Sequence, residues 1–373
     1  MNDSPSRKGA NLPNDFEQVL KINPHQWQGK LRFVATSGYN TIFNYANGAF
    51  ARWGNTISED PDFSPLGPEI LDLEVSTICH GIKGKPCLWC YKENSPKGQN
   101  MSFDMFRTIF HKMPTNLTQI AFGIGDIDGN PDLWRMFEYC RANDHNLVVP
   151  NITINGWGLS KGHAQRLASL CGAVAVSHYN DDVCFNAVEL LARYGVRQIN
   201  IHQLMCEETY ADVKRLFDAI SVEGRLHHLH AIILLSLKCK GRGVGFTALS
   251  PIKFRALVSD ALARQLPIGF DSCTAPKFLA LVRDDPRKVA FQTLAEACES
   301  TLFSAYVNVT GKFFPCSFTE NEREWHEGID VMHCQNFLQD VWNFPTTRAF
   351  REKLFVTAAK NLDKCRECPV FVL

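Results

Sequence analysis

Three cysteines that stand close together in the sequence are the strongest candidates for chemistry. Cys79, Cys87 and Cys90 occur in the string ICHGIKGKPCLWCY, directly after an apolar run of strand type. The glycines and the proline between them favour a loop. Three thiolates on a loop can hold a [4Fe-4S] cluster and leave one iron open to a substrate or cofactor. Two alternatives stay open: a structural zinc site with His80 as a further ligand, or thiols that bind no metal.

A second group of cysteines lies near the C-terminal end of the sequence. Cys298 is followed by twelve residues, a glycine, four residues and Cys316, and the apolar alternation between them predicts a hairpin that brings both thiols together. Cys365 and Cys368 supply a second pair, so four thiols are available, and on chemistry alone zinc and an iron-sulfur cluster fit equally well. Cys273 is an alternative to one of these four. The other cysteines are expected to pack: Cys140, Cys171, Cys184, Cys206, Cys239 and Cys334.

Hydrophobic periodicity indicates the elements that must position these thiols. From Ile70 onward, short β-rich runs alternate with amphipathic stretches of helical length, which is typical of parallel βαβ units. The expected strands are Ile70–Val75, Gln119–Phe122, Leu147–Ile154, Ala173–Ser177, Gln198–His202 and His230–Leu237. The expected helices are Ser102–Lys112, Pro131–Ala142, Lys161–Leu170, Asp182–Arg193, Glu208–Ser221 and Pro251–Gln265. Six such units predict an α/β fold, a partial (β/α)6 barrel of the TIM type, whose sites lie at the carboxyl ends of the strands.

The pattern of apolar and polar stretches predicts three regions. Residues 1–69 are expected to form an N-terminal extension and linker, with a polar tail, a hairpin and a proline-rich stretch. Residues 70–265 are expected to form the partial barrel. Residues 266–373 lose the βα rhythm and are expected to form a small cysteine-rich α+β domain.

The composition argues against several classes of protein. The 373 residues are 45% hydrophobic and carry 39 Lys and Arg against 39 Asp and Glu, so no overall charge favours nucleic acid as a partner. No apolar run reaches the roughly 18 to 20 residues of a membrane helix, and the N-terminal segment lacks the apolar stretch of a secretory signal. We therefore expect a cytoplasmic protein without a membrane partner, whose fourteen cysteines stay reduced.

Together, the two cysteine patterns resemble the radical S-adenosylmethionine (radical SAM) superfamily. Its signature is Cys-x3-Cys-x2-Cys after the first barrel strand, with an aromatic residue before the last cysteine; Trp89 fills that position, and the first spacing here is seven residues instead of three. The spacing Cys-x12-Gly-x4-Cys is similar to the first motif of the SPASM and twitch domains, which hold auxiliary [4Fe-4S] clusters. Because the sequence ends five residues after Cys368, the resemblance implies one auxiliary cluster, bound by Cys298, Cys316, Cys365 and Cys368.

A glycine-rich loop follows the second expected strand, in the string FGIGDIDGNP. Taken alone, this loop is either a plain turn or a loop that a ligand can approach closely. It resembles the Gly-Gly-Glu-Pro segment that binds the amino group of SAM in the superfamily, with Asp126 at the Glu position. Polar residues also end the later strands, and one of them, His202, is an alternative contact for substrate. The cofactor-binding residues that the resemblance implies are Trp89, Gly123, Gly125, Asp126, Asn155, Ser177 and His202.

The resemblance implies an enzyme that binds SAM at the open iron of the first cluster. Reductive cleavage would give methionine and a 5′-deoxyadenosyl radical, which abstracts hydrogen from an unactivated C–H bond. The expected substrate is a ribosomally made peptide, and the alternatives are a small molecule or a nucleoside. An electron donor such as a flavodoxin or ferredoxin is the expected protein partner.

Two further interpretations concern binding. The run Lys238–Arg242 is locally basic and could hold a phosphate or the carboxylate of the cofactor, although RNA is not expected as a partner. A zinc-stabilised, non-catalytic binding protein on the same barrel is the alternative from a different class. It would explain both cysteine groups as structural, but not why the first offers only three thiols at the catalytic end of a barrel.

Overall fold

The computed structural model of the chain describes residues 31–36, 38–45, 48, 50–56, 59–142, 147–295, 297–360 and 366–371. The chain divides into two compact units, residues 1–62 and 63–373. In the first unit, three antiparallel strands pair in the order β1 (Leu31–Thr36), β2 (Tyr39–Asn44) and β3 (Phe50–Trp53). Ile42 and Trp53 are buried and form its core. The hairpin expected within residues 1–69 is therefore present, with a third strand added, whereas the expected polar tail lies outside the described residues.

The second unit is built around a ten-stranded sheet in the order β10-β9-β8-β7-β6-β5-β4-β11-β12-β13. The strands are β4 (Ile70–Glu74), β5 (Gln119–Gly123), β6 (Val149–Ile154), β7 (Ala173–Ser177), β8 (Gln198–Met205), β9 (Ala231–Ser236), β10 (Ile268–Phe270), β11 (Ser304–Val307), β12 (Lys312–Phe314) and β13 (Ile329–Asp330). From β4 to β10, all neighbouring strands are parallel. The six expected strands and the α/β fold class are confirmed.

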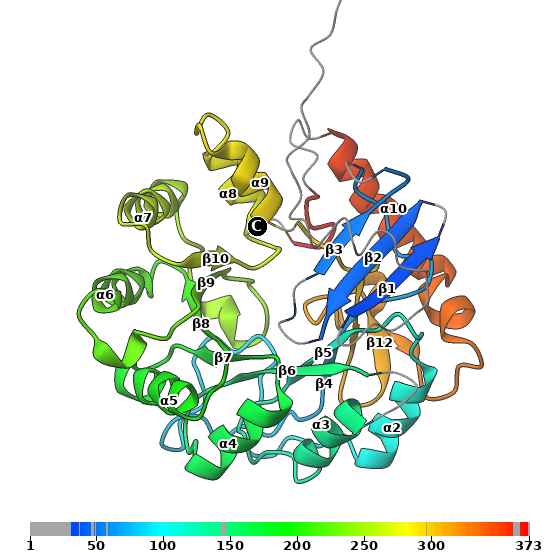
Figure 1. Cartoon of the computed structure of the whole chain (residues 1–373), viewed down its shortest axis with the longest axis horizontal. Coiled ribbons are helices and arrows are strands. Elements are labelled where there is room, and N and C mark those ends of the chain that lie inside the picture. The colour runs from blue at the N-terminus through cyan, green and yellow to red at the C-terminus, as the bar shows by residue number, and fades with distance from the viewer. Residues whose placement is uncertain are drawn as a thin grey trace, which may run out of the picture. The chain divides into compact units, whose positions relative to one another are not determined.

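Six helices follow the parallel strands and lie along the outer side of the curved sheet (Figure 1). They are α2 (Phe103–Lys112), α3 (Leu133–Ala142), α4 (Lys161–Leu170), α5 (Asp181–Arg193), α6 (Tyr210–Ile220) and α7 (Pro251–Ala263). Three further helices belong to the C-terminal part: α8 (Ala275–Leu281), α9 (Lys288–Leu294) and α10 (Pro345–Lys360). The start of α2 shows the local cause, because the Ser102 hydroxyl accepts a hydrogen bond from the Met105 amide at 3.2 Å and caps the helix. All six expected helices are confirmed to within two residues at each end.

Side chains of the parallel strands alternate between the helix side and the interior of the barrel. On β4, Leu71 and Leu73 are only 0% and 1% exposed, because the outer helices cover them. Successive side chains of a strand point to opposite faces, so Asp72 and Glu74 face the barrel interior. The fold therefore places two carboxylates inside the barrel on its first strand.

The sheet continues past the boundary that the sequence predicts near residue 266. Strand β10 pairs in parallel with β9, and β11 pairs in parallel with β4 on the opposite side of the barrel. β11 also forms the expected antiparallel hairpin with β12, which Gly311 turns at a φ of 79°. The three residues of β10 are too few to show a strand period in the sequence. Among the described residues, no helix has both the length and the apolar character needed to cross a membrane.

Candidate functional site

The first three cysteines lie on the loop between β4 and α2, at the carboxyl end of the first barrel strand. Cys79, Cys87 and Cys90 are half-buried free thiols. The Cys79 amide donates a hydrogen bond to the Ser95 carbonyl oxygen at 3.0 Å, so the returning part of the loop supports the first cysteine. The expected position at the catalytic end of the barrel therefore agrees with the fold.

The four extra residues between the first two cysteines form a tight turn. The Ile82 amide donates to the Lys85 carbonyl at 3.1 Å, and the Lys85 amide donates back to the Ile82 carbonyl at 3.0 Å. The two central residues, Lys83 and Gly84, have φ angles of 53° and 77°, the left-handed values that a two-residue hairpin requires. The turn accommodates the long first spacing, and it exposes Lys83 and Lys85.

The glycine-rich loop after β5 packs directly against the first cysteine. A Cβ atom on Gly125 would lie 2.4 Å from the Cys79 Cβ and 2.9 Å from its Sγ, so only glycine fits this approach. The Asp126 carboxylate accepts hydrogen bonds from the His80 amide at 2.6 Å and from the Asn155 side-chain amide at 2.8 Å. Its Oδ1 also lies 3.7 Å from the Cys79 Sγ. The structure thus gathers three sequence-predicted residues, Gly125, Asp126 and Asn155, beside Cys79 and the adjacent His80 backbone.

A second set of predicted residues surrounds Cys87 and Cys90. Trp89 packs against Tyr179, with ring centroids 5.7 Å apart. The Tyr179 hydroxyl is hydrogen-bonded to the Cys87 thiol and to Ser177, the polar residue that ends β7. A hydrogen bond from the Cys87 thiol lowers the pKa of Cys90 to about 6 and raises that of Cys87. Ser177 therefore contacts the cysteine loop through Tyr179, which the sequence analysis did not single out.

Arg242, which follows β9, hydrogen-bonds the main chain of the same loop. Its Nε donates to the Cys87 carbonyl at 3.0 Å, and its terminal nitrogens donate to the Asn94 carbonyl at 3.2 Å. Its own amide donates to the Cys90 carbonyl at 3.1 Å. The basic run Lys238–Arg242 thus binds protein groups here, and in the sequence it could be recognised only as a cluster of charge.

His202 lies within β8, the strand next to that of Ser177. It is the register partner of Ser177 on the neighbouring strand, and burial lowers its pKa to about 4, an effect that Asp271 opposes. Asp271 forms an ion pair with Lys238, whose side chain is 4% exposed. No hydrogen bond joins His202 to the cysteine loop within the described residues, so His202 stays a prediction as a cofactor contact.

The C-terminal thiols gather around the hairpin β11–β12. Burial raises the pKa of Cys316 to about 12, and the nearby charges of Cys298 and Cys368 act in the same direction. Arg366 donates to the Cys298 carbonyl at 3.2 Å, which holds the C-terminal segment beside the first thiol. Cys273 lies within electrostatic range of Cys298 and Cys316, so it stays a candidate ligand. Cys365 lies outside the described residues.

The donor set of the first loop fits an iron-sulfur cluster. Cys79, Cys87 and Cys90 are free thiols, and cysteine thiolates are the usual ligands of such clusters. The glycine at position 125 lets the neighbouring loop approach Cys79 closely. Among the described residues, no group of three His, Cys, Asp or Glu side chains forms a site for a single metal ion.

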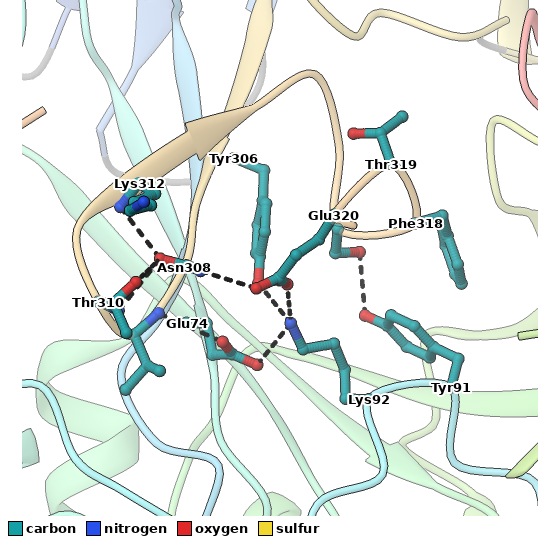
Figure 2. A network of polar contacts seen from close by, with 12 residues as sticks. Glu74, Tyr91, Lys92, Tyr306, Asn308, Thr310, Lys312, Phe318, Thr319 and Glu320 are labelled. Atoms are coloured by element: carbon teal, nitrogen blue, oxygen red, sulfur yellow. Dashed lines mark hydrogen bonds and ion pairs between the residues drawn. The ribbon is translucent and has the colours of Figure 1, made fainter. Parts of the chain in front are cut away.

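A buried ionic network centres on the Lys92 ammonium (Figure 2). The Lys92 ammonium lies 3.1 Å from the Glu74 carboxylate, forms an ion pair with Glu320 and hydrogen-bonds the Tyr306 hydroxyl at 2.8 Å. The exposed fractions of the Lys92, Glu74 and Glu320 side chains are 12%, 7% and 14%. Glu74 also accepts a hydrogen bond from the Val309 amide at 3.2 Å.

The network connects three distant parts of the sequence. Lys92 stands two residues after Cys90, Glu320 stands four residues after Cys316, and Glu74 ends the first barrel strand. Its members come from separate segments, and no short spacing pairs them. The sequence analysis therefore missed the network.

Comparison with solved structures identifies the fold. Streptococcus suis SuiB bound to S-adenosylmethionine superposes with a TM-score of 0.57 at 13% identity, over 83% of this chain and 76% of that chain. The protein anSMEcpe with bound AdoMet gives 0.57 at 13% identity, over 80% and 85%. Native anSMEcpe with AdoMet and the Cp18Cys peptide gives 0.56 at 13%, over 79% and 88%. No curated protein sequence matches the chain.

A family comparison identifies the C-terminal part. Residues 298–369 match the SPASM family, an iron-sulfur cluster-binding domain. The chain thus shares its fold with these AdoMet-bound proteins, and residues 298–369 match the SPASM domain. The family match supports the expected iron-sulfur cluster in the C-terminal part, and the structural matches support the expected barrel fold.

Proposed function

We propose that the chain is a radical SAM enzyme that modifies a C–H bond of a peptide. The observation that carries the proposal is the three-cysteine loop at the carboxyl end of the first barrel strand, with Gly125 and Asp126 packed against Cys79. When bound there, a [4Fe-4S] cluster and SAM supply reductive cleavage to methionine and a 5′-deoxyadenosyl radical. A loop with three thiols leaves one iron free for that cofactor.

The residues of the chain have separate tasks in this proposal. Cys79, Cys87 and Cys90 hold the first cluster, and Arg242 fixes the loop that carries them through its bonds to main-chain carbonyls. The glycine loop and the end of β6, where Asn155 is 6% exposed, form the wall that receives the cofactor. Trp89, Ser177 and His202 complete the set of predicted cofactor contacts. The barrel walls exclude water from the reacting atoms.

The auxiliary cluster is assigned to the SPASM domain. Cys298, Cys316 and Cys368 are its proposed ligands, with Cys365 as the fourth and Cys273 as the alternative. Support comes from the described thiols themselves, because Cys298 and Cys368 lie near enough to Cys316 to add to the rise that burial causes in its pKa, and Cys298 and Cys316 act in the same way on Cys273. We assign residues 70–265 to the barrel and 266–373 to the auxiliary domain, although the sheet joins them.

A peptide substrate is favoured over a small molecule by one comparison. The anSMEcpe structure of similar fold holds a peptide together with AdoMet. A flavodoxin or ferredoxin is the proposed electron donor. The lysines of the turn at residues 82–85 are exposed beside the first cysteines, which would favour an acidic donor at this surface.

The test is release of 5′-deoxyadenosine from SAM by the anaerobically reconstituted, dithionite-reduced chain. We expect release from the parent and none from a variant with Cys79, Cys87 and Cys90 changed to Ala. Cys239→Ala is the control, because Cys239 is exposed and lies outside both groups. A colourless parent that contains zinc and releases no 5′-deoxyadenosine would refute the enzyme and favour the zinc-stabilised binding protein.

A further inference from the structure

One carboxylate inside the barrel has no partner in the described part of the chain. Asp72, the third residue of β4, is paired in register with Tyr306 of β11 and with Ala121 of β5. The alternation of the strand turns its side chain to the interior of the barrel, where it is exposed to solvent. It forms no hydrogen bond or ion pair with any described residue. Its register neighbour on β5, Ala121, has a small apolar side chain that offers the carboxylate no polar partner.

Glu74, two residues further along the same strand, shows the contrasting case. Its carboxylate is paired with the Lys92 ammonium at 3.1 Å and accepts a hydrogen bond from the Val309 amide at 3.2 Å. Lys92 is also occupied by Glu320, so it is not available to Asp72. The two carboxylates thus face the same interior, but the fold provides a counter-charge for only one of them.

The charge around this part of the barrel is unbalanced. Glu74 and Glu320 already share the Lys92 ammonium, so Asp72 adds a third carboxylate for which no further ammonium is paired among the described residues. Partial desolvation by the surrounding barrel raises the pKa of Asp72 to about 6, although its side chain still reaches solvent. A cationic ligand inside the barrel would supply the opposite charge that the described residues do not provide.

We propose that Asp72 is a substrate-binding residue whose carboxylate receives a cationic group of the substrate, an amine or a guanidinium. The inference rests on the proposed function, because it places the substrate inside the barrel, beneath the cysteine loop. For a peptide, the cationic group is a lysine or arginine side chain or the terminal amine. The neighbouring Glu74 and Glu320 add to the negative potential that attracts it.

The test measures binding of two probes that differ in charge. N-acetylarginine amide is cationic, and N-acetylcitrulline amide is its neutral counterpart of nearly the same shape. Binding to the reconstituted full-length chain is followed by ligand-observed NMR for the parent, Asp72→Asn and Asp72→Ala. Asp104→Asn is the matched control, because its carboxylate on α2 is 82% exposed and faces away from the barrel. Iron content establishes that each variant is folded and loaded.

We expect the arginine probe to bind the parent and Asp104→Asn equally, and both Asp72 variants roughly tenfold more weakly, as the loss of one charged hydrogen bond predicts. The citrulline probe should bind all four proteins weakly and alike. Equal binding of the arginine probe to parent and Asp72→Asn, or no binding to the parent, would overturn the assignment. The readout needs no SAM cleavage, so a parent that releases no 5′-deoxyadenosine refutes the proposed function by itself.

Discussion

The two cysteine-bearing regions are held in place by different forces. The loop of Cys79, Cys87 and Cys90 is fixed by polar contacts from other loops, while Leu88 within it is 69% exposed. The C-terminal thiols surround a hairpin whose Phe313 is fully buried. Hydrogen bonds fix the direction of a loop, whereas apolar packing resists any change of volume. A single substitution should therefore change the geometry of the first region without unfolding it. The second region should not tolerate such a change, because its hairpin belongs to the apolar core.

The largest expected effect is on the iron content per chain, which distinguishes the two cysteine-bearing regions. The parent should hold about eight irons per chain, and removal of Cys79, Cys87 and Cys90 should leave about four, by the arithmetic of [4Fe-4S] sites. Removal of Cys298 and Cys316 should also leave about four, and cleavage of SAM should be lost only in the first variant. Iron and sulfide analysis with a 5′-deoxyadenosine assay decides this. About four irons in the parent and none in the Cys79, Cys87 and Cys90 variant would exclude the auxiliary cluster.

The next effect tests whether the glycine loop shapes the first site. In Gly125→Ala, the new methyl group would lie 2.4 Å from the Cys79 Cβ, so Cys79 must move. We expect loss of about four irons with the fold retained, since the contact is local. Gly224→Ala is the control, because its added Cβ meets nothing within 4 Å. Equal iron in both variants would show that the loop yields without affecting the site.

The ionic network around Lys92 should contribute to stability. Lys92→Met leaves Glu74 and Glu320 buried without their ammonium, so we expect a loss of about 3 to 5 kcal/mol in the free energy of unfolding. Lys353→Met is the matched control. It breaks the more exposed pair with Glu324 and should cost no more than about 1 kcal/mol. Denaturant titration of the reconstituted proteins measures both values, and equal losses would contradict the structural role of the network.

The smallest effect concerns the pH dependence of stability at Asp72. Folding raises its pKa from 3.8 to about 6, so the native state binds the proton more tightly and loses stability as the pH rises through this window. Asp72→Asn should therefore melt higher than the parent at pH 8, and the gap should narrow toward pH 5. Because the side chain is open to solvent, we expect only about 1 kcal/mol, or about 2 °C.

The titratable groups near Asp72 do not obscure the difference between the parent and Asp72→Asn. Glu74, Tyr91 and Tyr306 face the same region, and they are present in both proteins. Burial raises the pKa of both tyrosines above the range used, so they do not titrate there. The titration of Glu74 occurs in both proteins and largely cancels in the difference. A constant gap from pH 5 to pH 8 would contradict the shifted pKa of Asp72.

The predictable part of the molecule depended on local pattern. The alternation of apolar runs predicted the parallel strands and their helices, and the spacing between Cys298 and Cys316 predicted the hairpin β11–β12. The structure also brings Asp126 and Asn155 within hydrogen-bond distance, as expected for residues that follow neighbouring strands of one barrel.

The unpredicted part depended on contacts between distant segments. Arg242 binds a loop 148 and 155 positions away, and Lys92 pairs with a glutamate 228 positions away. Neither contact has a local period, because long side chains reach their partners in space. The continuation of the sheet through β10 was missed because three residues are too few to carry a strand pattern.

The parallel pairing of β11 with β4 has a consequence for how the molecule could be divided. β4 has β5 on one side, and only β11 covers its other edge. A chain ending at residue 265 would leave that row of amides and carbonyls open, and an open edge invites pairing between copies and aggregation. The auxiliary domain therefore covers an edge of the barrel sheet and also carries the second group of thiols. Such a domain could be exchanged between proteins only if the strand that covers this edge is exchanged with it.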